Sequence, residues 1–202
     1  MAHWIETEAE LETHYGTPKV TALAKVSKRI TPDYRALIEA SPFCALASVG
    51  PEGLDCSPRG DAAPVVIVED DTTLILPDRR GNDRIDTLRN IVRDPRVALM
   101  FLVPGSGTVM RVNGRARITA DAEVCARYEK EGKAPRTVIA VTVVEVYFQC
   151  SRAVMRAGLW DGRDMTAGLP TVGQILQRLS QDEIDGASYD AAWPARAKEG
   201  MW

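Results

Sequence analysis

Residues 73–84 read Thr73-Leu74-Ile75-Leu76-Pro77-Asp78-Arg79-Arg80-Gly81-Asn82-Asp83-Arg84, and they join an apolar, strand-like run to a helix-like run that follows. Where a strand leads into a helix, the first N–H groups of the helix are unpaired and the positive end of its dipole faces the turn. The arginines add guanidinium groups, which bind phosphate oxygens in a bidentate manner. This stretch therefore predicts an anion site, with phosphate as the preferred ligand.

Composition limits the classes of protein that this chain represents. Its 202 residues are 45% hydrophobic and 26% charged, which suits one globular domain with helical appendages. A net charge of −3 does not favour nucleic-acid binding, and no apolar run reaches the roughly 18 residues of a membrane span. The N-terminus does not resemble a secretion signal. We therefore expect a cytoplasmic protein that binds neither nucleic acid nor membrane.

The supply of metal ligands and nucleophiles is small. Cys44, Cys56, Cys125 and Cys150 are scattered without a Cys-x-x-Cys pair, and the chain has two histidines. We therefore expect no metal site. The cysteines are interpreted as small buried hydrophobic residues, and Cys150 as structural rather than nucleophilic, because no histidine lies near it in the sequence.

Runs of β-branched and aromatic residues predict six strands in series. Several of the connections are short and rich in Gly, Pro and Asp, as antiparallel hairpins require. Closure would hide the edges of such a sheet, so we expect a mainly β (α+β) fold, a closed six-stranded antiparallel barrel. The predicted strands cover residues 43–49, 62–68, 72–76, 97–103, 108–118 and 137–148. The last run is apolar on both faces, which suggests contact with a helix or a partner subunit.

Helices are predicted around this barrel. Thr31 and Pro32 are a typical N-cap and first helical residue, and they open a helix that runs to residue 40. Further helices are expected after residue 85, over residues 121–131 up to Gly132, and over residues 172–179. The chain thus divides into an N-terminal helical segment (1–41), a barrel (42–160) and a helical C-terminal extension (161–202).

Four motifs of this chain resemble the pyridoxamine 5′-phosphate oxidase-like FMN-binding split-barrel proteins. They are Ser57-Pro58-Arg59-Gly60-Asp61, Leu76–Arg84, Asp94-Pro95-Arg96-Val97-Ala98-Leu99-Met100-Phe101 and Leu159-Trp160-Asp161, within residues 42–160. The resemblance implies a split barrel that binds FMN at the interface of a homodimer. True pyridoxamine phosphate oxidases carry an arginine- and histidine-bearing C-terminal segment, which this chain lacks, so it is more similar to an uncharacterised branch.

The resemblance also implies roles for single residues. Asn82 occupies the family's usual Ser/Thr position and Arg84 its usual Lys/Arg position, so both are implied to hold the flavin phosphate. Arg111 falls where the family directs a polar side chain towards the cofactor. The implied cofactor-binding set is Ser57, Arg59, Asp61, Pro77, Asp78, Arg79, Asn82, Arg84, Arg111 and Trp160; no catalytic residue is implied.

Each of these residues also has an ordinary structural interpretation. Exposed arginines are commonly solvated, although arginine at a helix N-terminus opposes the dipole unless an anion is present. Asp61 is also compatible with a simple turn after Gly60, Arg111 with a surface position on its strand, and Trp160 with a cap on the core. The sequence leaves these alternatives open.

The leading functional hypothesis is an FMN-dependent oxidoreductase with an unknown small-molecule substrate. The flavin would carry out the redox chemistry, which agrees with the shortage of histidine. The alternatives are a flavin- or haem-binding module without turnover and a deazaflavin-dependent reductase on the same barrel. Neither the electron donor nor the substrate follows from the sequence.

Overall fold

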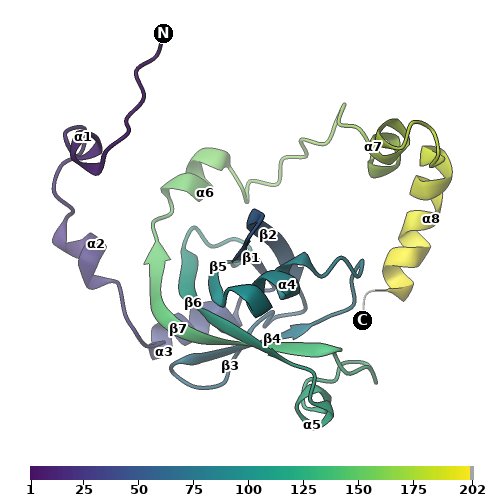
Figure 1. Ribbon diagram of the computed structural model, residues 1–202, viewed down its shortest axis with the longest axis horizontal. Helices are drawn as coiled ribbons and strands as arrows, with labels where there is room; N and C mark the ends of the chain where they lie inside the picture. The colour runs from purple at the N-terminus through teal and green to yellow at the C-terminus, as the bar shows by residue number, and fades with distance from the viewer. Residues whose placement is uncertain (201–202) are drawn as a thin grey trace.

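The structure, a computed structural model, describes residues 1–200, so the last two residues of the predicted C-terminal extension lie outside the described part (Figure 1). The strands are β1 (Phe43–Gly50), β2 (Gly53–Gly60), β3 (Ile67–Val68), β4 (Thr73–Asp78), β5 (Arg96–Leu102), β6 (Val109–Thr119) and β7 (Thr137–Gln149). The helices are α1 (Glu8–Glu12), α2 (Val20–Ala24), α3 (Pro32–Glu39), α4 (Asp86–Arg93), α5 (Ala122–Ala126), α6 (Arg152–Ala157), α7 (Val172–Leu179) and α8 (Gly186–Glu199).

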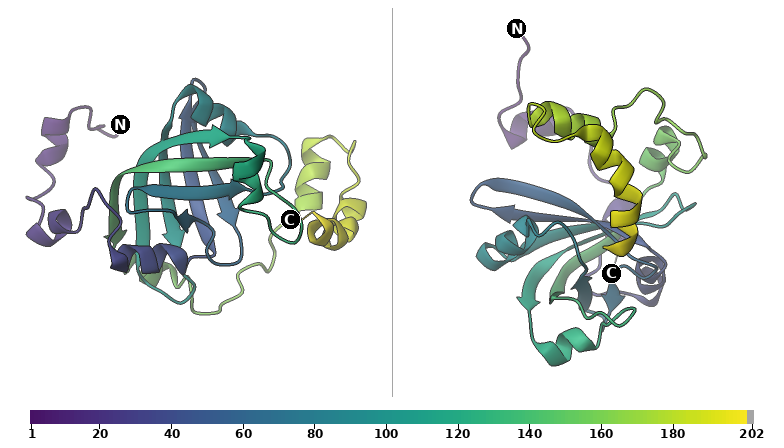
Figure 2. Two further views of the ribbon diagram at one scale, coloured as in Figure 1. Left: turned by 90° about the horizontal axis from the view of Figure 1, so that it is seen from below. Right: turned by 90° about the vertical axis from the view of Figure 1, so that its right-hand side faces the viewer.

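The strands form one antiparallel sheet in the order β2-β1-β5-β6-β7-β4-β3. The antiparallel prediction is confirmed, but a closed barrel of six strands is wrong: seven strands curl around the core and the sheet stays open (Figure 2). The two edge strands of the open sheet are protected from pairing with further strands in other ways. Edge strand β2 contains Pro58, which has no N–H to offer a further strand, and edge strand β3 is only two residues long.

The second strand of the sheet was not predicted. Residues 53–60 (GLDCSPRG) have a low β-propensity, yet they pair with β1 along their whole length, from Gly50↔Gly53 to Phe43↔Gly60. The run predicted as a strand at 62–68 is strand only at Ile67–Val68. Proline at position 64 cannot donate to a ladder, so the apolar residues before β3 fill the core from a loop instead.

Helix α4 lies across the inner face of the sheet and is fastened to the β1–β2 hairpin. Ile91 is buried in the core, and the Nδ2 of Asn90 donates a hydrogen bond to the Oγ of Ser48 at 3.2 Å. The backbone of Gly50 lies very close to the side chain of Asn90. A Cβ added to Gly50 would lie only 2.1 Å from the Oδ1 of Asn90. This contact holds the second turn of α4 against the end of β1.

The predicted helix at 31–40 is confirmed as α3, with Thr31 as N-cap and Pro32 in its first turn. The helix predicted at 121–131 is shorter, because α5 ends at Ala126 and the chain then forms turns. Glu131 and Gly132 both have positive φ and join Lys130 to Lys133 in a two-residue hairpin turn. This turn brings both lysines to the end of β4.

The segments at the two ends of the chain project from the sheet on opposite sides (Figures 1 and 2). Helices α1 and α2 contain no buried residue, and α7 packs mainly against α8. The prediction of α7 at 172–179 is confirmed, whereas α8 was not expected, because glycine begins it and Pro194 lies inside it. Within residues 1–200, no helix is long and apolar enough to cross a membrane.

The interpretation of all four cysteines as buried is wrong for two of them. Cys44 and Cys125 are buried, whereas Cys56, on the outer side of edge strand β2, and Cys150, after the end of β7, are exposed. Burial raises the pKa of the Cys44 thiol to about 12, although nearby Arg59 opposes this shift. Cys44 is therefore a protonated, unreactive thiol at neutral pH.

Candidate functional site

The main cavity of the described residues lies where β2 and β4 end. It has a volume of about 1090 Å³, and its walls come from residues 55–61, 76–88, 130 and 133–137, together with Val65. The end of β2, the loop 79–85 with the start of α4, and the hairpin after α5 thus meet at one place. The loop that the sequence analysis singled out forms one complete side of this cavity.

The cavity brings together eight of the ten residues that the family resemblance implied, and it leaves out Arg111 and Trp160. The guanidinium carbon of Arg111 lies 5.1 Å from the ring centroid of Tyr147, and the indole N–H of Trp160 donates to the carbonyl of Ser106 at 2.7 Å. The eight that line it are Ser57, Arg59, Asp61, Pro77, Asp78, Arg79, Asn82 and Arg84. Their roles as ligands of a cofactor remain predictions.

Two ion pairs and a lysine form the inner wall. The Nη1 of Arg59 donates to the Oδ1 of Asp78 at 2.6 Å, and the Nε of Arg79 donates to the Oδ2 of Asp61 at 3.0 Å. Lys130 contacts the other oxygen of Asp61. These side chains are only 8–26% exposed, so the pairs are weakly screened by solvent. They join β2, β4 and the hairpin after α5.

Arg59 has one unsatisfied donor. Its Nε is buried and has no hydrogen-bond partner within residues 1–200, while its Nη1 is held by Asp78. A buried, charged N–H group without an acceptor is costly, so such a group commonly marks a place where a ligand supplies the acceptor. An anion in the cavity would supply that acceptor.

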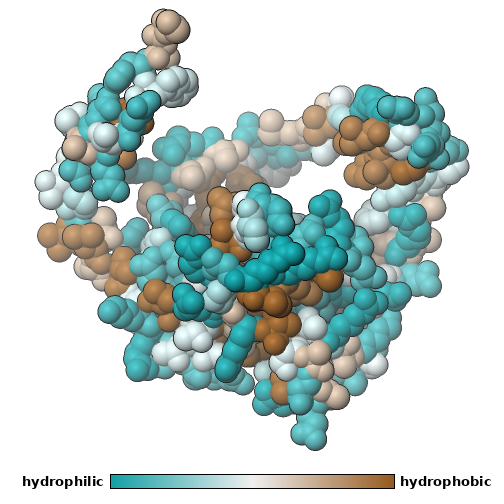
Figure 3. Space-filling view, in the orientation of Figure 1, coloured by the Kyte–Doolittle hydropathy of each residue, from teal (hydrophilic) through white to brown (hydrophobic). Residues whose placement is uncertain are grey.

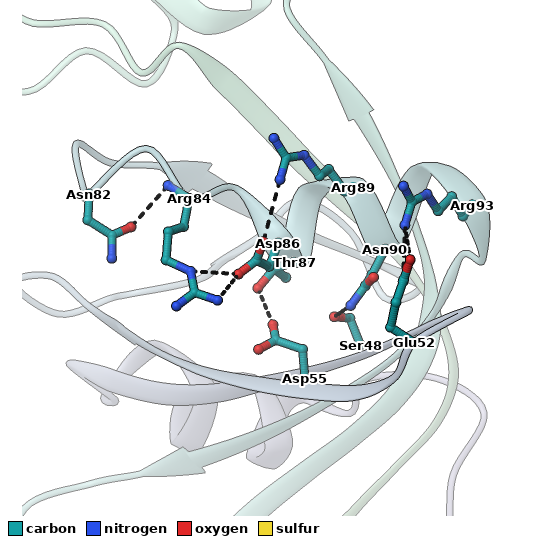
Figure 4. Close-up of polar contacts among 10 residues, drawn as sticks. All are labelled: Ser48, Glu52, Asp55, Asn82, Arg84, Asp86, Thr87, Arg89, Asn90 and Arg93. Atoms are coloured by element: carbon teal, nitrogen blue, oxygen red, sulfur yellow. Dashed lines mark hydrogen bonds and ion pairs between the residues drawn. The ribbon is translucent and has the colours of Figure 1, made fainter. Parts of the chain in front are cut away.

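The start of α4 supplies further donors. The residue before it, Ile85, has φ 52° and gives no side-chain cap, so the first backbone N–H groups of the helix are not capped by it. Thr87, in the first turn, donates to the Oδ2 of Asp55 at 2.7 Å (Figure 4). The Oγ1 of Thr87 also lies 3.1 Å from the Oγ of Ser57. The α4 N-terminus and the hydroxyl groups therefore face the end of β2.

Arg84 and Asn82 are held by local contacts. The Nε of Arg84 donates to the Oδ2 of Asp86 at 2.9 Å, and the backbone N–H of Arg84 donates to the Oδ1 of Asn82 at 3.2 Å (Figure 4). The Arg84 side chain is 77% exposed, so this ion pair adds little stability. Within residues 1–200, the amide Nδ2 of Asn82 has no hydrogen-bond partner, which leaves this donor for a ligand.

The cavity is more positive than the chain as a whole. Seven cationic side chains line it (Arg59, Arg79, Arg80, Arg84, Lys130, Lys133, Arg136), together with five carboxylates (Asp55, Asp61, Asp78, Asp83, Asp86). The cavity thus has a net charge of +2 in a chain with a net charge of −3. A local excess of positive charge attracts an anionic ligand into the cavity.

Several residues of this cavity were not predicted from the sequence. Lys130, Lys133 and Arg136 come from a segment about 50 residues after the loop 79–85, and Arg136 forms an ion pair with Asp83 at 2.9 Å. The Glu131-Gly132 turn was the available signal, because such a dipeptide between two lysines suits a tight hairpin. No group of three or more His, Cys, Asp or Glu side chains within residues 1–200 is arranged to hold a metal ion.

The open, curled sheet and the cationic cavity at the ends of β2 and β4 define a split-barrel protein with a positively charged pocket. The chain belongs to the pyridoxamine 5′-phosphate oxidase family, whose model matches residues 30–150. The matched part includes every residue that lines the cavity, so the cavity lies within the family fold.

Solved structures share this fold. HupZ from Group A Streptococcus is 18% identical over 60% of this chain and 95% of its own length, with a TM-score of 0.50. A Lactobacillus delbrueckii protein, provisionally assigned as a pyridoxamine 5′-phosphate oxidase, is 22% identical over 60% of this chain and 95% of its own length, with the same TM-score. None of the curated proteins matches the sequence.

Proposed function

We propose that this protein is a homodimeric FMN-dependent oxidoreductase that acts on a small molecule. The observation that carries the proposal is the cationic cavity of a member of the pyridoxamine 5′-phosphate oxidase family, with the buried and unpaired Nε of Arg59 on its wall. FMN joins a dianionic phosphate to a flat ring system. It therefore needs clustered cations at one end of its site and an apolar wall beside them.

The residues of the cavity suit such a ligand. Arg59, Arg80 and Asn82 offer donors without a complete set of partners within residues 1–200, and the N-terminus of α4 lies beside them. Val65 and Leu76 supply buried apolar surface on the same walls. The volume of about 1090 Å³ is slightly above the usual range for ligand pockets, about 300–1,000 Å³, so a flavin leaves room for a small substrate.

A bound flavin supplies hydride and electron transfer, so the protein need only bind, orient and shield. Asp78 and Asp61 hold the guanidinium groups of Arg59 and Arg79 in place, which fixes donor directions before the ligand arrives. Thr87 and Ser57 hold hydroxyl groups at the same end of the cavity. The chain's two histidines, His3 and His14, lie in the exposed N-terminal segment outside the cavity.

The homodimer in this proposal accounts for the two implied residues that the cavity lacks. Arg111, on the outer face of β6, and Trp160, after α6, are proposed to meet the cofactor bound to the second copy. The family resemblance implies a cofactor site between two subunits, and both residues are only partly buried in the single chain. Each copy would then add a wall to the other copy's cavity.

Binding of FMN tests the site. We expect FMN to bind and its fluorescence to be quenched by the protein. We expect Arg59→Ala to weaken this binding by about 2 kcal/mol, roughly 30-fold, the value of a charge-assisted hydrogen bond to a phosphate. Arg29→Ala is the matched control, because Arg29 is 68% exposed and lies outside the cavity. Equal losses in both variants, or uptake of haem or a deazaflavin in place of FMN, would contradict the assignment.

Turnover separates an enzyme from a flavin-binding module. We expect the FMN-loaded protein to oxidise NADH or NADPH, in the presence of a quinone or nitroaromatic acceptor, faster than the same concentration of free FMN, because the protein orients the flavin. Stopped-flow absorbance at the flavin band measures the reduction. If the protein binds FMN tightly but the bound FMN is reduced no faster than free FMN in solution, the protein would be the non-catalytic module instead.

A further inference from the structure

The C-terminal hairpin, defined as α7, α8 and their connection, is a well-formed unit. Thr171 and Gln174 form a capping box at the start of α7, and Thr171 also donates to Asp190 of α8 at 2.5 Å. The two helices touch through glycines, since a Cβ on Gly173 would lie 2.1 Å from the carbonyl oxygen of Gly186. Because these specific contacts hold its two helices together, the hairpin has a defined outer surface that a partner can bind.

That outer surface is apolar and uncovered. Val172, Ile175 and Leu179 recur at helical spacing on α7 and are 59%, 39% and 79% exposed, and Leu169 before them is 65% exposed. Figure 3 shows this brown, hydrophobic cluster at the upper right, away from the sheet. The chain's own barrel is available as a partner, yet the hairpin packs mainly within itself. Its apolar stripe therefore suits a surface on another molecule.

The exposed area of the chain is large for its mass. The chain exposes 13840 Å², whereas a compact monomer of 22.1 kDa exposes about 9,300 Å². The excess of about 4,500 Å² per chain is several times the roughly 800 Å² per partner of a standard interface. Such an excess is typical of chains with segments that become covered on assembly.

A receiving surface exists on the outer face of the sheet. Phe43 on β1, Leu54 on β2 and Met100 on β5 are 36%, 87% and 42% exposed on this face. Beside them, Arg96 of β5 lies directly opposite Arg115 of β6, and Arg117 follows two residues on. Asp94 of the same chain pairs with Arg96 at 2.6 Å, so the exposed Arg115 and Arg117 are the cations on this face that a negatively charged partner would meet.

The C-terminal hairpin supplies that charge. Residues 161–199 contain seven carboxylates and four cationic side chains, a net charge of −3, whereas residues 27–160 have a net charge of +2. Asp182, Glu183 and Asp185 lie in the connection between α7 and α8, close to the end of the apolar stripe. Hairpin and outer sheet face therefore match in both apolar surface and charge.

We propose that the C-terminal hairpin of each chain packs on the outer face of β1, β2 and β5 of a second copy, so that the two copies exchange arms. The proposal rests on the homodimer proposed above, and it assigns a segment outside the family match to the contact. The α7 stripe covers Phe43, Leu54 and Met100 of the second copy, and the acidic connection lies near its Arg115 and Arg117.

Site-specific photocrosslinking of the full chain tests this contact. With p-benzoylphenylalanine in place of Ile175, we expect irradiation to give a covalent species of twice the chain mass of 22.1 kDa. We expect its crosslinked peptides to map to strands β1, β2 or β5 of the second copy. The same group in place of Ala192, exposed on α8 away from the stripe, should crosslink several-fold less. Met100→Glu should reduce the yield from position 175 several-fold.

Light scattering on the same samples separates this proposal from the homodimer itself. A dimer whose position 175 crosslinks within its own chain, elsewhere on the second copy, or no more than position 192 would overturn the exchange and leave the dimer standing. A monomer at micromolar concentration would overturn both. A dimer crosslinked from the stripe to the outer sheet face supports both.

Discussion

FMN is expected to bind more than 100-fold tighter than riboflavin, a difference of about 3 kcal/mol. The two ligands share the ring system and differ in the phosphate. The phosphate would meet the net positive cavity, the unpaired Nε of Arg59 and the uncapped start of α4. Fluorescence titration of both ligands against the same protein, at one fixed ionic strength, measures the ratio.

Salt provides an internal control for this difference. Added salt should reduce the preference for FMN, because it screens the attraction between the phosphate and the partly exposed cations, and should change riboflavin affinity little. Equal affinities for the two flavins at low salt would mean that the cavity does not bind the phosphate. The assignment of Arg59, Arg79 and Arg84 would then lose its basis.

Asp61→Ala is expected to destabilise the folded protein by about 3 kcal/mol, because it removes a buried carboxylate that two cations share. The Asp61 side chain is 8% exposed and accepts from Arg79 and Lys130, so the substitution leaves two partly buried cations without their shared partner. Urea unfolding of the cofactor-free protein measures the loss, since a bound ligand would add its own stabilisation.

The matched control is Asp71→Ala at the protein surface. Asp71 accepts two hydrogen bonds from the Nη1 of Arg29 at 2.7 and 2.9 Å, but the two side chains are 51% and 68% exposed. Solvent screens this pair, so its loss should cost less than about 1 kcal/mol. Similar losses for the two variants would show that burial does not strengthen the Asp61 cluster.

Residues with clear local preferences were predictable from the sequence. Thr31-Pro32 set the start of α3, and the periodic apolar residues of 172–179 set α7. Strand β2 was not predictable in this way, because Gly53, Asp55 and Pro58 disfavour a strand and its conformation comes from the partner strand β1. The sheet likewise stays open at the short edge strand β3. The length of this strand is set by tertiary contacts and not by local propensity.

In the candidate site too, features set by local sequence were predictable and features set by long-range contacts were not. Residues 76–84 form one continuous motif, so the side of the cavity that they build was predictable from their order alone. Lys130 and Arg136 reach the cavity only because a tight turn redirects the chain after α5, and such long-range placement leaves no periodic signal. The pairing of Arg59 with Asp78 was not predictable either. The two residues lie on β2 and β4, which are not neighbours in the sheet, so predicting their contact requires the register of both strands.

The contact between Gly50 and Asn90 has a consequence for the evolution of this chain. No side chain at position 50 can be accommodated while Asn90 keeps its place, and the amide of Asn90 in turn fixes α4 on Ser48. A change at either position thus alters the fitness of changes at the other. A lineage that enlarges residue 50 therefore needs a smaller residue 90, and it then loses the hydrogen bond that anchors α4 on β1.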